Sequence, residues 1–266
     1  MLRLGLLGER LGHSLSPLIH QVFSRETGIA LTYTLYEAPA EELPERLDAM
    51  LRELDGFNVT IPYKERVIPR VGRLDETAQA IGAVNTVNCR GGSPTAHNTD
   101  VPGFSAMLRS AGIDPAGKPC FVLGTGGASK AVTAALRAMG AASVTLVSRH
   151  PAGEEIGYSE LPGRFRGLLV NTTPVGMWPR VDACPLTDEA LSLILPRAEG
   201  VADVIYNPAE TKLTQAARAR GIPACTGAVM LAAQALEAER IWTGQSLPDD
   251  LLRPMTAAIR EALRNG

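Results

Sequence analysis

Short apolar runs alternate with segments of helical hydrophobic spacing along nearly the whole chain of 266 residues. Strand and helix in repeated succession are typical of α/β folds with largely parallel sheets. We therefore predict an α/β protein, and its length suits one large domain or two modest ones. The strands expected are 2–7, 31–37, 57–61, 84–89, 95–97, 121–123, 143–147, 168–171 and 201–205, and the helices expected are 17–26, 40–54, 63–71, 76–81, 129–139, 229–242 and 250–264.

The alternation falls into two series, which favours two domains. One series ends near residue 97, and another begins after Gly117, with a helix expected in the segment 102–117 that joins them. The helices at the end of the chain could pack back on the first series. The N-terminal domain would then be discontinuous in sequence.

Composition and charge exclude several classes of protein. Charged residues make up 20% and apolar residues 45% of the chain, which excludes a disordered protein. The net charge of −2 gives no basic footprint for nucleic acid, and no stretch approaches the ~20 apolar residues of a membrane span. The four cysteines are far apart and the four histidines lack ligand spacing, which favours buried thiols in a reducing cytoplasm over a metal site.

A glycine-rich turn follows a predicted strand and precedes a predicted helix at Gly124-Thr-Gly126-Gly127-Ala-Ser129. Glycines let the backbone turn tightly and approach a pyrophosphate, while the helix N-terminus faces its negative charge. The same glycines could serve a purely structural turn, but the strand before and the helix after favour dinucleotide binding.

The next predicted strand indicates which dinucleotide is bound. An NAD site places Asp or Glu there to bind the ribose 2′-hydroxyl, whereas this strand ends in Ser148-Arg149-His150 and no acid follows until Glu154. A cation at this position suits a 2′-phosphate, so we expect NADP. The alternative is that Arg149 is an ordinary surface arginine.

Short polar side chains gather where several predicted strands end. In Asn58-Val-Thr60-Ile-Pro62-Tyr-Lys64 the polar residues share one face of the strand, and Lys64 comes just after the strand ends. Lysine is rare in this chain, which has only four. Gly82-Ala-Val-Asn85-Thr86, His97-Asn-Thr-Asp100 and His13-Ser14-Leu-Ser16-Pro17 bring further polar groups to loops. Each string alone is compatible with turn or capping chemistry. Together they indicate a site for a small polyhydroxylated acid.

These strings, taken in order, resemble the shikimate dehydrogenase family over nearly the whole chain. The further matching strings are Gly124-x-Gly-Gly-Ala-Ser129, Asn171-Thr-Thr-Pro-x-Gly-Met177, Asp203-x-x-Tyr206 with Pro208, and Gly227 through Met230 to Gln234. The resemblance implies a cytoplasmic enzyme of aromatic amino acid biosynthesis, a monomer or homodimer, that reduces 3-dehydroshikimate with NADPH. It implies a substrate-binding domain of residues 1–101 with 228–266, and a Rossmann-like NADP-binding domain of 102–227.

The resemblance also implies roles for individual residues. Lys64 would be the general acid for the carbonyl oxygen, and the base in the oxidative direction, with Asp100 as its catalytic partner. The expected substrate ligands are Ser14, Ser16 and Tyr206 for the carboxylate, and Thr60, Asn85 and Gln234 for the ring hydroxyls. The expected cofactor ligands are Gly124, Thr125, Gly126, Gly127, Ala128 and Ser129 in the loop, Arg149 at the 2′-phosphate, Val204, Gly227 and Met230 near the nicotinamide, and Glu76.

The sequence departs from the family in the cofactor domain. The family usually has Asn-Arg-Thr where this chain has Ser148-Arg149-His150, and the stretch 151–167 is short and rich in glycine and proline. We therefore expect one crossover trimmed to a loop, with Lys130 supplying part of the missing positive charge. The alternatives are an NAD-using quinate/shikimate enzyme and a non-catalytic shikimate-binding sensor.

Overall fold

The computed structural model of the protein describes residues 1–265, and within that range the chain divides into two compact units. The first unit comprises Met1–Thr99 and Gln234–Glu261, and the second comprises Asp100–Ala233 and the residues from Ala262. The chain passes into the second unit at the start of α4 (Asp100–Ser110) and returns inside α9 (Ala228–Thr243). The first unit is thus discontinuous in sequence.

The first unit is built on a mixed sheet with the strand order β2-β1-β3-β5-β6-β4. Strand β1, next to the edge strand β2, runs parallel to both β2 and β3, whereas β5 pairs antiparallel with β3 and β6. The hairpin expected near residues 84–97 therefore forms, and it makes this sheet less parallel than predicted. The bounds are β1 Leu2–Gly8, β2 Leu31–Glu37, β3 Gly56–Val59, β4 Arg73–Leu74, β5 Thr86–Asn88 and β6 Thr95–His97.

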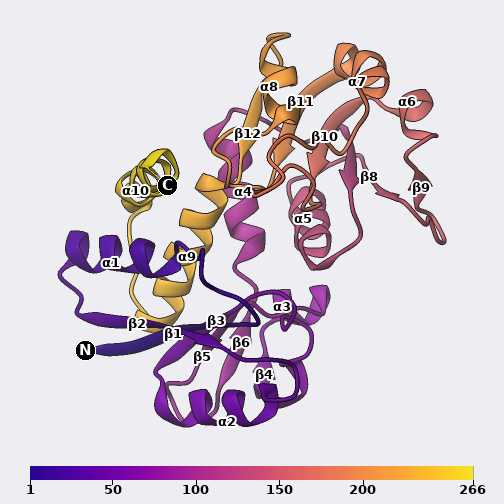
Figure 1. The fold of residues 1–266 in the computed structure, drawn as a ribbon. Coiled ribbons are helices and arrows are strands. Elements are labelled where there is room, and N and C mark those ends of the chain that lie inside the picture. Colours follow the sequence, from indigo (N-terminus) through magenta and orange to yellow (C-terminus); the bar gives the residue numbers. More distant parts are fainter. Residues whose placement is uncertain (266) are drawn as a thin grey trace. The chain divides into compact units, whose positions relative to one another are not determined.

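Helices cover both faces of this sheet (Figure 1). On one face α2 (Leu43–Glu53) inserts Leu47 and Met50 against Phe57 of β3. On the other lie α1 (Ser16–Thr27) and α9, where Trp242 packs on Leu4 of β1. A Cβ on Gly56 would lie 2.3 Å from the indole nitrogen of Trp242, so this strand position requires glycine. Burying each such large apolar side chain contributes about 1.5–3 kcal/mol.

The predicted helix over residues 63–71 does not form as such. The segment is a series of turns that ends in a 3-10 turn at Ile68–Arg70. Pro69 has no N–H and its ring clashes with the preceding turn, so an α-helix cannot continue through this position. The expected helix at residues 76–81 does form, as α3 (Glu76–Ile81), with Asp75 as its N-cap.

The second unit contains a parallel sheet with the strand order β12-β11-β10-β7-β8-β9. The chain runs outward from β7 through β8 to β9, then returns to β10 on the other side of β7. This reversal of strand order is the Rossmann-like topology, whose ligand crevice lies at the carboxyl ends of the strands at the reversal. The bounds are β7 Pro119–Leu123, β8 Ser143–Ser148, β9 Ile156–Gly157, β10 Gly167–Asn171, β11 Ala198–Asp203 and β12 Ala224–Thr226.

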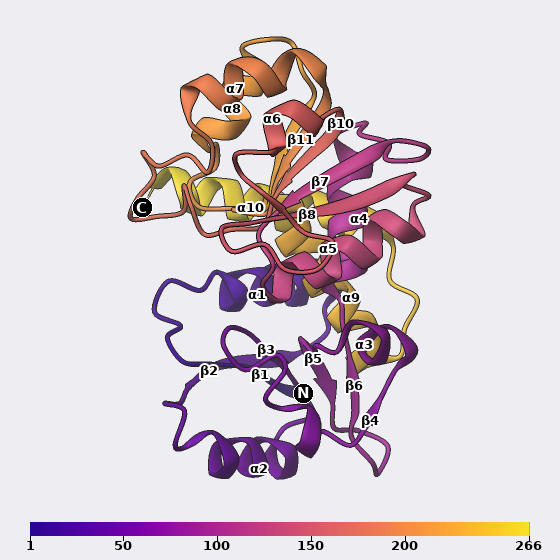
Figure 2. The same ribbon diagram turned by 90° about the vertical axis from the view of Figure 1, so that its right-hand side faces the viewer.

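Alternate residues of β7 serve the two hydrophobic layers of this unit. Cys120 and Val122 pack toward α4 and α5 (Gly127–Ala138), and Phe121 and Leu123 pack on the opposite face. The helices of that opposite face are α6 (Leu161–Arg164), α7 (Asp188–Ile194) and α8 (Lys212–Arg218). Figure 2 shows α7 and α8 away from α4 and α5.

The shortened crossover between β8 and β10 retains regular structure, which corrects the expectation of a plain loop. Residues 156–157 form β9, in which Ile156 pairs with Val147 of β8. Leu161 of α6 is fully buried in the same hydrophobic layer as Ile156. These two apolar anchors order a segment whose glycines and prolines alone favour a loop.

Candidate active site

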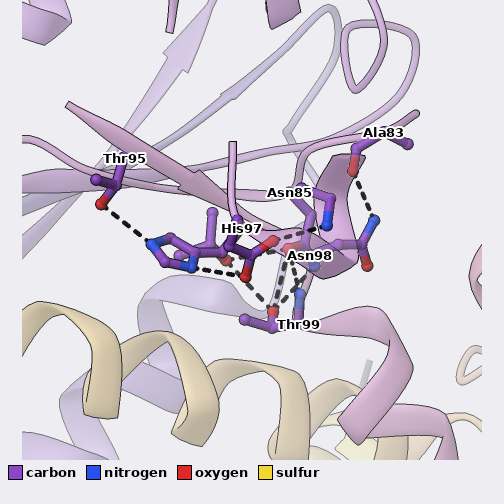
Figure 3. Close-up of polar contacts among 9 residues, drawn as sticks. Ala83, Asn85, Thr95, His97, Asn98 and Thr99 are labelled. Atoms are coloured by element: carbon purple, nitrogen blue, oxygen red, sulfur yellow. Dashed lines mark hydrogen bonds and ion pairs between the residues drawn. The ribbon is translucent and has the colours of Figure 1, made fainter. Parts of the chain in front are cut away.

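A cluster of buried polar side chains lies where β3, β5 and β6 meet in the first unit. The Asn58 amide donates to the Asn85 carbonyl oxygen at 3.1 Å and to Thr86 Oγ1 at 3.0 Å. The Asn85 amide donates to Thr99 Oγ1 at 3.0 Å and its Oδ1 accepts from the Thr99 amide at 2.8 Å (Figure 3). Such networks hold side chains in one orientation because every broken bond leaves a buried polar group unpaired. Asn85 is the member that the sequence led us to expect here; Asn58, Thr86 and Thr99 have the same surroundings.

The turn after β3 carries Thr60 and Lys64. Tyr63, fully buried, donates from its hydroxyl to the Ala38 carbonyl oxygen at 2.6 Å and from its amide to the Thr60 carbonyl oxygen at 2.9 Å. The amide of Val84 donates to the Lys64 carbonyl oxygen at 2.8 Å. These bonds fix the backbone on both sides of the half-buried Lys64 side chain. Thr60, the first residue after β3, is also half-buried.

Ser14 lies just before α1, and Ser16 is the first residue of that helix. Ser14 Oγ accepts a hydrogen bond from the Ser16 amide at 3.3 Å. Tyr33 of β2 joins this segment to the polar cluster, because its hydroxyl donates to Asn58 Oδ1 at 2.7 Å. Burial raises the pKa of Tyr33 well above its ordinary value, and a side-chain hydrogen bond with Ser16 opposes the rise. Gln234 accepts a long hydrogen bond of 3.5 Å from Thr99 at its Oε1.

A fully buried pair lies next to Tyr33 and was not anticipated from the sequence. His20 Nδ1 and Glu239 Oε1 are 2.6 Å apart, and both side chains are 0% exposed. The His20 ring stacks on Tyr33, with centroids 4.0 Å apart. His20 is one helical turn after Ser16 on α1, and Glu239 follows Gln234 on α9. The pair therefore joins the two helices that carry these expected substrate ligands.

The second unit has a cavity of about 620 Å³ at the carboxyl end of β7, where the strand order reverses. Gly124 lines it with φ +100°, and a Cβ there would lie 3.0 Å from Thr173 Cγ2 and 3.1 Å from Thr172 Oγ1. A glycine is therefore required at this turn. The lining residues are Gly124, Thr125, Gly126, Val147, Ser148, Arg149, His150, Tyr158, Thr172, Thr173, Pro174, Val175, Gly176, Arg180 and Ala183.

The lining of the cavity suits the phosphate groups of a dinucleotide. Gly126 is the N-cap of α5 and brings no side chain, so the first amides of this 12-residue helix face the turn. Arg149, Arg180 and His150 line the cavity, and none of the described lining residues carries a carboxylate. An anion such as a phosphate is therefore favoured. Burial raises the pKa of Tyr158, and the nearby charge of Arg149 opposes that rise.

The structure separates the predicted cofactor residues into three groups. Gly124, Thr125, Gly126 and Arg149 line the cavity, whereas Gly127, Ala128 and Ser129 lie in the first turn of α5 outside its lining. The Ser129 hydroxyl is buried and donates to the Gly126 carbonyl oxygen at 2.6 Å, so it braces the turn.

The remaining predicted residues lie elsewhere in the two units. Val204 and Gly227 meet after β11 and β12, where a Cβ on Gly227 would lie 2.0 Å from the Val204 carbonyl oxygen. Met230 is buried with α4 and α5, Tyr206 is half-buried, and Asp100 is buried at the start of α4. Glu76 is a residue of α3 in the first unit, partly open to solvent.

Asp203 is connected to the cavity lining by hydrogen bonds through Asn171 to Thr173. It is fully buried, and its carboxylate accepts from Asn171 at 3.0 Å, Thr211 at 2.9 Å and the Ile205 amide at 3.1 Å. Asn171 in turn accepts from the amide and hydroxyl of Thr173, at 3.0 and 2.7 Å. Burial raises the pKa of Asp203 to about 6, against the opposing effect of these hydrogen bonds.

Among residues 1–265 no cluster of three or more His, Cys, Asp or Glu side chains is arranged to hold a metal ion. Over the same range, no helix has the length and hydropathy needed to cross a membrane.

Comparison with known proteins places this geometry in a family. The family model described as the shikimate dehydrogenase substrate binding domain matches residues 6–87. A Thermus thermophilus protein named shikimate dehydrogenase (NADP(+)) is 40% identical, with 99% of each chain covered. This chain belongs to the shikimate dehydrogenase family. A Moorella thermoacetica member with the same name is 36% identical over 97% of this chain and 92% of its own.

Solved structures of shikimate dehydrogenases have the same fold over the full length. A chorismate mutase/shikimate 5-dehydrogenase fusion protein from Clostridium acetobutylicum superposes with a TM-score of 0.93 at 34% identity, covering 99% of both chains. A Thermus thermophilus enzyme solved in complex with NADP(H) and shikimate gives 0.87 at 36% identity, covering 99% of this chain and 100% of its own. The α/β fold with a substrate domain and a Rossmann-like domain, expected from sequence, is confirmed.

Proposed function

We propose that this shikimate dehydrogenase family member interconverts 3-dehydroshikimate and shikimate with NADPH and NADP+, as a step of aromatic amino acid biosynthesis. The observation that carries the proposal is the β7 cavity, which combines a glycine turn, a helix N-terminus and Arg149 with no carboxylate on the described lining. The relative solved with both NADP(H) and shikimate, at 36% identity, supports the same pair of ligands for this chain.

Proton transfer is assigned to Lys64 in this proposal. Its ammonium gives a proton to the carbonyl oxygen during reduction, and its amine takes one from the hydroxyl during oxidation. When bound, NADPH supplies the hydride. Asp100 orients the reacting hydroxyl and assists the lysine. Supporting these roles, hydrogen bonds of Tyr63 and Val84 fix the backbone around Lys64, and Asp100 is a buried carboxyl at a helix start.

Substrate recognition follows from short hydrogen-bonding side chains whose orientation is already set. Ser14 and Ser16, with Tyr206, bind the carboxylate, and Thr60, Asn85 and Gln234 bind ring hydroxyls. The supporting observation is the Asn58–Asn85–Thr86–Thr99 network, which holds Asn85 in a single amide orientation. Preorganised donors and acceptors lower the entropic cost of binding a small polar ligand.

Cofactor binding divides among the residues that the sequence indicated. Gly124–Ser129 hold the pyrophosphate, Arg149 holds the 2′-phosphate, and Val204, Gly227, Met230 and Glu76 act at or near the nicotinamide end. The corresponding domains are residues 1–101 with 228–266 for substrate, and 102–227 for NADP. Close contact between Val204 and Gly227 supports their joint role, because a side chain at 227 would displace the Val204 backbone.

The proposal also includes a cytoplasmic protein that is a monomer or homodimer and binds neither nucleic acid nor membranes. The thiols of Cys120 and Cys225 are free, and burial raises the pKa of each to about 12. Thiols of this kind resist oxidation and suit a reducing compartment. Light scattering during size-exclusion chromatography measures the oligomeric state.

The experiment that tests the proposal is shikimate oxidation, followed by absorbance of the reduced nicotinamide, with NADP+ and NAD+ in parallel reactions. We expect turnover with a strong preference for NADP+. Equal or better turnover with NAD+ contradicts the cofactor assignment and favours an NAD-using quinate/shikimate enzyme. No turnover with either nucleotide, together with shikimate binding in calorimetry, favours a non-catalytic sensor.

A further inference from the structure

Arg180 lines the β7 cavity together with Arg149, although 31 positions separate them in sequence. Arg149 follows β8 directly, and Arg180 lies in the loop after β10. Because β8 and β10 are the two neighbours of β7 in the sheet, the arginines come from both sides of the strand that carries the glycine turn. The cavity is therefore supplied with positive charge from two independent segments.

The loop that carries Arg180 is held in place by its own backbone. Successive turns are closed by hydrogen bonds from the amides of Met177, Arg180 and Ala183 to carbonyl oxygens three residues earlier, at 3.2, 2.9 and 3.1 Å. The Trp178 amide donates to the Asn207 carbonyl oxygen at 3.0 Å, which ties the loop to the segment after β11. Gly176 has φ +99° at the start of these turns, a backbone conformation that favours glycine. The backbone that carries Arg180 is thus preorganised.

The acidic side chains nearest to Arg180 and Arg149 in sequence do not compete for them within the cavity. Asp182 lies 3.5 Å from the ammonium of Lys212. Glu154, the first acid after Arg149, is exposed, and Glu155 accepts a hydrogen bond of 3.1 Å from the Ala152 amide within its own turn. None of these three acids lines the cavity. The described lining of the cavity thus carries two arginines and no carboxylate.

We propose that Arg180 is a specificity-determining residue that binds the 2′-phosphate of NADP(H) jointly with Arg149. This inference rests on the proposed function, since it assigns a further ligand to the same nucleotide. A phosphate monoester carries about two negative charges near pH 7 and offers three acceptor oxygens, so two guanidinium groups can bind it at once. NADH has no 2′-phosphate and so offers Arg180 no such group to bind.

The test measures nucleotide binding rather than turnover. Dissociation constants for NADPH and NADH are obtained from nicotinamide fluorescence, and those for adenosine 2′,5′-bisphosphate from calorimetry. The proteins are the wild type, Arg180→Ala, Arg180→Lys, Arg149→Ala and the double alanine variant. The control is Arg166→Ala, which removes an exposed arginine of the same unit that does not line the cavity.

Arg180→Ala should weaken NADPH and the bisphosphate about ten- to a hundredfold, as for loss of a charge-assisted hydrogen bond, and change NADH less than about twofold. Arg180→Lys should lie between, because it keeps the charge but loses the planar fork. The loss should shrink as ionic strength rises, because salt screens the attraction. Arg166→Ala should match the wild type.

Equal losses for NADPH and NADH overturn the inference, because Arg180 would then act on a part common to both nucleotides. Unchanged NADPH binding in Arg180→Ala also overturns it. A wild-type protein that binds NADH as tightly as NADPH contradicts the proposed cofactor instead, so the two failures are distinguishable.

Discussion

The buried His20–Glu239 pair makes a quantitative prediction about the stability of the first unit. The two groups are 2.6 Å apart and inaccessible to water, while His20 Nε2 and Glu239 Oε2 have no hydrogen-bond partner among the described residues. Removing one partner leaves the other unpaired in an apolar interior, which lowers the free energy of unfolding by about 3–5 kcal/mol. We therefore expect Glu239→Leu and His20→Phe each to lower the free energy of unfolding by about that amount.

The double variant His20→Phe/Glu239→Leu should recover most of the loss. Replacing both members of a buried pair by apolar groups of similar volume is neutral or stabilising by about 1–4 kcal/mol. A phenylalanine at position 20 can also stack on Tyr33, as the His20 ring does at a centroid distance of 4.0 Å. The single variants should melt lower by roughly 2–4 °C per kcal/mol lost, and the double variant near the wild type.

The assay is urea unfolding followed by tryptophan fluorescence in a Trp178→Phe background. Of the two tryptophans, Trp242 then remains, and its ring lies 5.6 Å from that of His20, so its fluorescence reports on the first unit. The four proteins form a double-mutant cycle whose interaction energy should exceed about 3 kcal/mol. Single variants that cost less than about 1 kcal/mol, or a double variant no more stable than either single, refute the reasoning.

Further predictions concern catalysis, substrate binding and pH. Lys64→Ala should lower kcat by roughly 10²–10⁴-fold, the usual contribution of a general acid; a loss confined to KM contradicts the assignment, and Lys118→Ala, which removes a lysine paired with Glu199 at 3.3 Å, is the control. Ser14→Ala combined with Ser16→Ala should raise KM for shikimate and leave NADPH binding unchanged in fluorescence titrations; weakened NADPH binding would assign these serines elsewhere. Because the pKa of Asp203 rises from 3.8 to about 6 on folding, the native state binds more protons between those values. Its contribution to stability is present below pH 3.8 and lost as pH rises through 6, by about 3 kcal/mol (1.36 kcal/mol per pKa unit). Asp203→Asn should remove this slope from urea unfolding measured between pH 4 and 7, and an unchanged slope contradicts the role of Asp203.

Features encoded locally could be predicted from the sequence. The glycine turn at Gly124 can be predicted because the hydrophobic pattern indicates both the strand before it and the helix after it. The location of Arg149 at the cavity can be predicted from its position directly after the next strand. The cofactor cavity was therefore predictable on the side of the sheet formed by β7 and β8.

Contacts between distant segments could not be predicted in this way. Arg180 lies in a loop with no hydrophobic periodicity, and only the return of β10 to the side of β7 brings it to the cavity. His20 and Glu239 are 219 positions apart, and a lone histidine on an apolar helix face does not reveal its partner. The predicted helix over 63–71 was wrong because Pro69 has no N–H and interrupts the helical hydrogen bonds that the hydrophobic spacing suggested. Residues 151–167 were expected as a loop because they are rich in glycine and proline. The burial of Ile156 and Leu161, which orders this segment, depends on tertiary packing that the local sequence does not show.

The crossing between units inside α9 has a consequence for the order in which the protein is made. Trp242 and Glu239, which complete the first unit beside Gly56 and His20, emerge only after the second unit has been synthesised nearly in full. The 140 residues from Thr99 to Glu239 take roughly 7–28 s to translate at about 5–20 residues per second, and the nascent first unit waits that long for these side chains. Most of the second unit, whose sheet is encoded in one continuous stretch that ends at Thr226, is made during that interval. The unit whose translation begins first therefore cannot complete its core until most of the other unit has been made.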